Sequence, residues 1–345
     1  MKVGVCGHIT DNIKLIGGQT VKTKEFLEGL QKKISSNNVD FINTNGWKKK
    51  PFSFLYKIKK LHKQNDIILF LTAQNGIRIF PRLFNFLNRF KRKKVHYIVI
   101  GGWLPELLKK NKNIFKSLKK MDGIHVETRT MKNELEILGL NNIYILNNFR
   151  NLNPLNHIEI RKNNYPIVFC YFSRVIKEKG IEDLISAVND INSDPRNIKK
   201  CFLDIYGPIT NEYKESISGI IDNEYINYKG VVDSKNSLNI LKNYYMQIFP
   251  TRYYTEGIPG SIIEGYFSGI PVIASKWESF DDLIDEKSTG IGFEFRNKED
   301  LKSQILWAMR NEKKVTEMKM NCLEKSYQYQ TEKVISEFLN IIKGE

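Results

Sequence analysis

Cysteine is scarce in this 345-residue sequence, and its four cysteines, at positions 6, 170, 201 and 322, form no C-x-x-C pair. This argues against a disulfide framework and against a thiolate zinc site. No run of eighteen apolar residues occurs, so no transmembrane helix is expected, and the first residues are typical of a β-strand and not of a signal peptide. We therefore expect a cytoplasmic protein.

Acidic residues are scarce in one half of the chain only. Residues 1–150 contain 29 lysines and arginines against 10 aspartates and glutamates, whereas the remainder contains 25 against 28. The first half is therefore expected to face an anionic partner, which the charge alone leaves open as a nucleic acid, a membrane surface or an acidic substrate.

Two segments of this basic half, 48–60 and 80–94, combine cations with large apolar side chains. In the second, Phe80, Phe84 and Phe90 follow helical spacing, so one helix face is apolar and basic residues flank it. Two interpretations remain open. The helix packs on the core with a solvated back, or it lies on an anionic bilayer.

Short aliphatic runs alternate with amphipathic stretches along the whole chain, which predicts βαβ units and parallel sheets. Single helices are expected over 77–90 and over 104–120. The alternation stops between 147 and 166, where turn-forming residues indicate a linker. We predict an α/β protein with an N-terminal domain over 1–150 and a C-terminal domain over 151–345. A cleft would separate their sheets, and the last helix, 331–342, is expected to pack back on the first domain.

Ligands of open parallel sheets bind beyond the carboxyl ends of the strands, so the loops there receive most weight. Gly17 and Gly18 precede the first helix and could admit a phosphate to its N-terminus, but a plain turn explains them equally well. Neither G-x-G-x-x-G nor a P-loop motif occurs, which disfavours dinucleotide-binding and P-loop proteins.

A second loop, 173–180, carries Arg174 and Lys179 after the first strand of the second domain. Two cations five residues apart could clamp a diphosphate, although a solvated charged loop is the alternative.

The third loop, 255–264, contains Glu256 and Glu264 around a glycine- and proline-rich helix start. Carboxylates are poor phosphate ligands but good acceptors for sugar hydroxyls. Together the loops suit a ligand with hydroxyls at both ends and phosphates between them, which is a sugar nucleotide.

These residues resemble a known family. The stretch EGIPGSIIEGYFSGIPVIAS, from 256 on, matches the E-x7-E motif of retaining glycosyltransferases, and residues 173–180 are similar to the Arg…Glu-Lys-Gly loop of the same group. The resemblance is to glycosyltransferase family 4. It implies the GT-B fold, with two Rossmann-like domains whose parallel sheets face a central cleft. The acceptor would bind the first domain and the nucleotide-sugar donor mainly the second.

The resemblance also implies roles for individual residues. Arg174 and Lys179 would neutralise the donor diphosphate, and Glu256 would bind sugar hydroxyls. The further donor-binding residues are Gly17, Gly18, Gly257, Ile258, Pro259, Gly260 and Glu264. Many relatives carry a histidine after the fourth strand of the first domain. Here the loop 101–106 has none, so Glu106 or backbone groups would replace it.

The implied activity is transfer of a hexose from a nucleotide diphosphate, a UDP-sugar being the expected donor, to a glycan or lipid-linked acceptor in bacterial surface polysaccharide or capsule synthesis. No cofactor is expected. No Asp-x-Asp occurs and the histidines lack metal-ligand spacing, so we also expect no metal. The protein would bind peripherally to the inner face of the membrane. Two alternatives stay open. One is a nucleic-acid-binding protein, although the basic half shows no nucleic-acid-binding signature. The other is a sugar-nucleotide epimerase or phosphorylase on the same fold.

Overall fold

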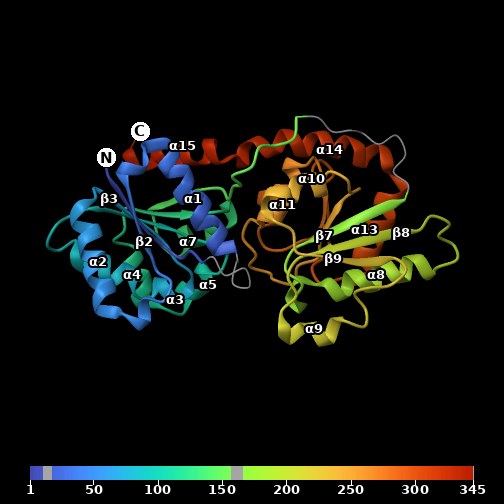
Figure 1. Cartoon of the computed structure of the whole chain (residues 1–345), viewed down its shortest axis with the longest axis horizontal. Helices are drawn as coiled ribbons and strands as arrows, with labels where there is room; N and C mark the ends of the chain where they lie inside the picture. Colours follow the sequence, from blue (N-terminus) through green and yellow to red (C-terminus); the bar gives the residue numbers. More distant parts are fainter. Residues whose placement is uncertain (11–17, 157–165, 345) are drawn as a thin grey trace. The chain divides into compact units, whose positions relative to one another are not determined.

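The computed structural model describes residues 1–10, 18–156 and 166–344 of the chain, which divides into two compact units (Figure 1). Unit 1 comprises Met1–Asn151 and Tyr329–Glu345, and unit 2 comprises Leu152–Gln328. Each unit contains a six-stranded, all-parallel sheet with helices on its faces. This confirms the predicted α/β fold class.

The sheet of unit 1 has the strand order β2-β1-β3-β4-β5-β6. Its strands are β1 (Val3–Gly7), β2 (Val39–Asn43), β3 (Ile67–Leu71), β4 (Lys94–Ile98), β5 (Gly123–Val126) and β6 (Ile143–Ile145). Its helices are α1 (Gly18–Ile34), α2 (Pro51–Gln64), α3 (Gln74–Ile77), α4 (Phe80–Leu87), α5 (Leu104–Lys109), α6 (Lys112–Leu118), α7 (Arg129–Ile137) and α15 (Thr331–Lys343).

Alternate residues of the buried strand β3 point to two separate apolar cores. Ile68 and Phe70 pack with α2 to α7, whereas Ile67 and Leu69 pack with α1 and α15. Figure 1 shows α15, in red at the C-terminus, beside α1. The last helix is therefore part of the core of unit 1, where Phe338 is fully buried.

Unit 2 has the strand order β12-β11-β10-β7-β8-β9. Its strands are β7 (Ile167–Phe172), β8 (Cys201–Tyr206), β9 (Ile226–Gly230), β10 (Gln247–Phe249), β11 (Val272–Ser275) and β12 (Gly290–Phe293). Its helices are α8 (Ile181–Ser193), α9 (Asn211–Ile217), α10 (Ser237–Leu241), α11 (Gly260–Phe267), α12 (Phe280–Leu283), α13 (Lys298–Arg310) and α14 (Glu312–Ser326).

Two of the expected single helices are interrupted. The segment 77–90 forms the end of α3 and then α4, which begins with Pro81 in its first turn, a position that suits the fixed φ of proline. The segment 104–120 breaks at Asn111, whose backbone is not helical and whose Nδ2 donates to the Leu107 carbonyl at 2.8 Å. A side chain that bonds the backbone locally competes with helix continuation.

Candidate functional site

The two loops with the candidate charges follow neighbouring strands of unit 2. Strand β7 pairs with β10 through Cys170 and Gln247, and the loops 173–180 and 250–259 leave the carboxyl ends of these strands. The topology therefore brings Lys179 and Glu256 to one edge of the sheet, where open α/β folds bind their ligands.

The β7 loop is packed tightly against the end of β10. Gly180 has φ +70°, and a Cβ atom at this position would lie 1.9 Å from the Pro250 carbonyl oxygen. Only glycine fits both the left-handed backbone and this close approach. Gly180 thus fixes the short 3-10 turn that contains Lys179, and so the position of that lysine.

The ammonium group of Lys179 is enclosed on several sides. Its Nζ donates to Oε2 of Glu256 at 2.5 Å, and it lies 5.0 Å from the ring centroid of Phe249 and 5.4 Å from that of Tyr253. Only 6% of the residue is exposed. Two aromatic faces stabilise the cation while its carboxylate partner offsets part of the cost of burial.

Glu256 is oriented through the same oxygen. Thr251 donates its hydroxyl to Oε2 of Glu256 at 3.2 Å, and the Thr251 oxygen in turn accepts from the backbone N–H of Tyr253 at 3.2 Å. Within the described part of the chain, no residue donates a hydrogen bond to the other oxygen, Oε1. One carboxylate oxygen is therefore held in place and the second is available to a ligand hydroxyl.

The remaining candidates of unit 2 surround the start of α11. Gly257, Ile258 and Pro259 are buried in the loop, and α11 begins at Gly260 without a side-chain cap. Uncapped N–H groups at a helix N-terminus form a site for negative charge.

The two further candidates of unit 2 are Glu264 and Arg174. Glu264, 7% exposed, lies one turn inside α11. Arg174 is exposed, and its carbonyl accepts from the Tyr171 hydroxyl at 2.6 Å, which fixes the backbone but leaves the guanidinium in solvent.

The remaining candidates, Gly17, Gly18 and Glu106, belong to unit 1. Gly17 lies outside the described residues, and Gly18 is the first residue of α1, with open space around it. Glu106 is on the exposed side of α5, where its hydrogen bond to Lys109, 2.5 Å long, lowers the pKa of its carboxyl group.

Sequence reasoning missed the residues that hold Lys179 and Glu256 in place. Phe249 and Tyr253 flank the ammonium, and Arg252 binds Asp183 of α8 through two hydrogen bonds of 2.7 and 3.0 Å. The run Phe-Pro-Thr-Arg-Tyr-Tyr just before Glu256 was the available signal. It is an aromatic and basic stretch at a strand end.

Unit 1 contains buried ionisable groups that the sequence did not single out. Lys22 of α1 pairs with Glu127 after β5, and both are at least 96% buried. Beside them, Nδ1 of His96 lies 3.1 Å from Nε2 of His125. Burial lowers the pKa of His96 to about 4 and that of His125 well below its usual value.

Among the described residues, no cluster of three or more histidine, cysteine or acidic side chains is arranged to hold a metal ion. The same residues include no helix whose length and apolarity would allow it to cross a bilayer.

The part of the chain that contains Lys179 and Glu256 matches a known protein family. Residues 153–325, half of the chain, match the family model described as glycosyl transferases group 1. The chain belongs to this family. The match covers β7 to β12 and includes Arg174, Lys179, Glu256 and Glu264.

A curated relative, an uncharacterised glycosyltransferase of Methanocaldococcus jannaschii, is 25% identical over 253 residues, which cover 65% of this chain. The aligned part spans 61% of the length of that relative.

Solved structures share the fold over the whole chain. A sucrose-phosphate synthase from Thermosynechococcus elongatus has a TM-score of 0.77 at 12% identity and covers 100% of this chain and 99% of its own. HepE from Anabaena, solved with UDP, has a TM-score of 0.76 at 12% identity, with 100% of both chains covered. The lipopolysaccharide outer core galactosyltransferase WaaB has a TM-score of 0.71 at 16% identity and covers 100% of this chain and 99% of its own. These likenesses show the GT-B glycosyltransferase fold.

Proposed function

We propose that the protein is a retaining glycosyltransferase that moves a hexose from a nucleotide diphosphate, with UDP as the expected carrier, to a glycan acceptor. The observation that carries the proposal is the contact between Lys179 and Glu256 at the ends of β7 and β10, within the region that matches the family. HepE has been solved with UDP and with UDP-glucose, which supports this donor class.

Each group of the site has a task in donor binding. The diphosphate would lie against the cations of Lys179 and Arg174 and against the uncapped start of α11, where the helix dipole places a partial positive charge. Oε1 of Glu256 would accept from a sugar hydroxyl, and Glu264 from the ribose hydroxyls. The backbone of Gly257–Gly260 would complete the contacts to the sugar and phosphates.

In the free protein Lys179 is already paired with Glu256, so donor binding would exchange one anionic partner for another. The diphosphate takes the ammonium, and the carboxylate turns towards the sugar. Binding of the phosphates and binding of the sugar would therefore be coupled through this one ion pair.

In the reaction, an acceptor hydroxyl oxygen forms a bond to the anomeric carbon while the bond from that carbon to the diphosphate breaks. The diphosphate leaves with the electron pair and takes up the proton that the hydroxyl loses. Fixed cations and helix N–H groups stabilise the charge that develops on the leaving group without reorganisation.

The acceptor is expected to be lipid-linked, in keeping with surface polysaccharide or capsule synthesis, which would place the enzyme peripherally on the inner membrane face. Exposed aromatic side chains among the lysines of α2 support this, since Phe52 and Tyr56 are 86% and 70% exposed. On and after α4, Phe86 and Phe90 are 50% and 78% exposed. Aromatic and basic side chains on one helix are typical of an interfacial segment.

A donor screen tests the proposal. The full chain is mixed with UDP-, GDP- and dTDP-sugars, and thermal unfolding is followed, because a bound ligand raises the unfolding temperature by mass action. We expect a rise with at least one UDP-sugar and a weaker rise with Glu264→Ala. Absence of a shift with every nucleotide sugar would remove the assignment.

Two finer parts of the proposal need their own measurements. The anomeric configuration of the product, read by NMR, distinguishes retention from inversion. Activity in excess EDTA tests the expected independence of a metal, and a loss that Mg²⁺ or Mn²⁺ restores would contradict it.

A further inference from the structure

The segment between β3 and β5 is almost free of negative charge. Residues 67–121 contain 13 lysines and arginines and a single carboxylate, that of Glu106. They form the strands β3 and β4 and the helices α3 to α6, and these helices cover one face of the unit 1 sheet. Such an excess on one face creates a strong positive potential.

These cations line two hollows in the surface. The first, of about 530 Å³, is lined by Arg78, Arg82, Lys109, Lys110 and Lys112, and no carboxylate is among its lining residues. Lys109 pairs with Glu106. In the described ranges, the other four cations form no ion pair with a carboxylate.

The second hollow, of about 520 Å³, shares Arg82 with the first and also contains Arg89, Arg92, Lys116 and Lys120. Because one arginine belongs to both, the two hollows adjoin. We call them together the phosphate groove. The half-exposed ring of Phe86 lines the second hollow.

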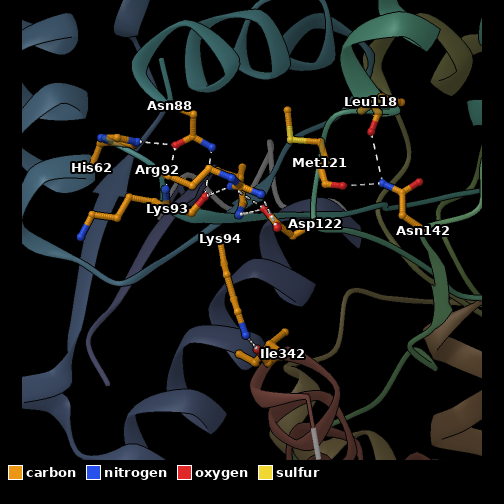
Figure 2. A network of polar contacts seen from close by, with 11 residues as sticks. His62, Asn88, Arg92, Lys93, Lys94, Leu118, Met121, Asp122, Asn142 and Ile342 are labelled. Atoms are coloured by element: carbon orange, nitrogen blue, oxygen red, sulfur yellow. Dashed lines mark hydrogen bonds and ion pairs between the residues drawn. The ribbon is translucent and has the colours of Figure 1, made fainter. Parts of the chain in front are cut away.

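The walls of the phosphate groove are held by hydrogen bonds. Asn85 of α4 donates to the Ser117 carbonyl of α6 at 2.9 Å, which joins the two helices across the groove. At its far end, Arg92 binds Asp122 through bonds of 2.6 and 3.0 Å (Figure 2). The same figure shows Asn88 linking His62 to the backbone of Lys93. The cations are therefore presented by a fixed framework.

We propose that the phosphate groove binds the phosphate groups of anionic membrane lipids. Unneutralised cations in a concave surface repel one another, and a bound anion relieves that repulsion. Arginine matches phosphate through a planar fork of donors, and three arginines line the second hollow. Phe86 and the exposed Phe90, in edge contact at 5.3 Å, add an apolar element that a bilayer accepts. The phosphate groove consists of residues of unit 1 alone. The proposal rests on the peripheral membrane placement proposed above, and its test measures vesicle binding and not glycosyl transfer.

Vesicle flotation of the full chain tests the proposal. Phosphatidylglycerol vesicles are compared with phosphatidylcholine vesicles, using Arg82→Ser/Lys112→Ser and the matched control Lys235→Ser/Lys242→Ser, which removes two exposed cations from unit 2. Each cation near an anionic surface raises vesicle affinity by about a factor of five. We therefore expect Arg82→Ser/Lys112→Ser to weaken binding to phosphatidylglycerol vesicles about 30-fold. The control should bind like the original protein, and phosphatidylcholine should not bind.

Pyrophosphate in solution and a random DNA duplex complete the experiment. Pyrophosphate should compete with vesicles, and it should bind the original protein but not Arg82→Ser/Lys112→Ser. This result would support a phosphate site that also accepts free anions. The proposal is overturned if both variant pairs lose equal affinity for vesicles, or if the duplex binds more tightly than phosphatidylglycerol. The charge-preserving variant Arg82→Lys/Lys112→Arg should keep vesicle binding, which separates lost charge from misfolding.

Discussion

Units 1 and 2 are built on similar six-stranded parallel sheets, yet they place their charged side chains differently. In unit 2 the candidate charges Lys179 and Glu256 follow the carboxyl ends of adjacent strands and contact one another. In unit 1 the cations lie on the outer helices α4 to α6, largely without acidic partners, and its buried ionisable groups pair inside the fold. The same architecture therefore brings opposite charges into contact at a sheet edge in one unit and gathers cations on the outer helices in the other.

A change in the backbone of the unit 2 site should have the most severe consequence. Gly180→Ala would place a Cβ atom 1.9 Å from the Pro250 carbonyl in a left-handed backbone, so we expect a loss of about 4 kcal/mol in unfolding free energy. Gly219→Ala is the control, because no atom lies near its Cβ position. Chemical denaturation compares the two variants. Equal unfolding free energies would show that the backbone around Pro250 shifts to admit the Cβ atom with little loss of stability.

Acid should act first on unit 1. His96 has a folded pKa of about 4 against an ordinary value of 6.5, so the folded state binds fewer protons between these values. Unfolding free energy should therefore fall as pH drops from about 6.5 to 4, by about 3 kcal/mol from this residue. NMR titration of the ring protons checks the cause, and a His96 midpoint near 6.5 would contradict it.

Removing Lys179, the buried cation of the unit 2 group, should weaken nucleotide binding. Lys179→Ala takes a charge-assisted hydrogen bond from the diphosphate, and we expect UDP affinity to fall about 30-fold, or about 2 kcal/mol. Lys177→Ala, in the same turn but exposed, should change affinity less than twofold. Calorimetric titration measures both, and similar losses in the two variants would indicate only a diffuse charge effect.

The exchange of partners at Lys179 should change nucleotide affinity only slightly. Glu256→Gln removes the carboxylate that competes with the diphosphate, so UDP alone should bind about fivefold more tightly, or about 1 kcal/mol. Turnover should fall, because the sugar loses its charged acceptor. Weaker binding of UDP in this variant would mean that the ion pair preorganises the site instead of competing for it.

Much of the fold could be predicted from the sequence because parallel strands are near-continuous apolar runs. The run Ile-Ile-Leu-Phe-Leu forms β3 and the run Gly-Ile-Gly-Phe forms β12, and every residue of both strands is buried. Helix breaks were harder. The side-chain bond from Asn111 to the Leu107 carbonyl divides the segment 104–120, and apolar periodicity continues across it without a signal.

The candidate site, too, could be predicted from the sequence only in part. Glu256 and Lys179 could be named from motif and loop position, and the structure shows them in contact. The run that contains Phe249 and Tyr253 draws attention to this strand end but does not assign the two rings to the site, because an aromatic residue at a strand end is usually a core residue. Only the register of β10 beside β7 places these rings around a cation from another loop.

Hydrogen–deuterium exchange with a saturating nucleotide sugar most directly tests whether the donor binds at unit 2. We expect slower exchange in 173–180 and 250–264, the two loops that meet at Lys179, and unchanged exchange in α4 and α6. Protection confined to unit 1, with both loops exchanging as in the free protein, would contradict the account.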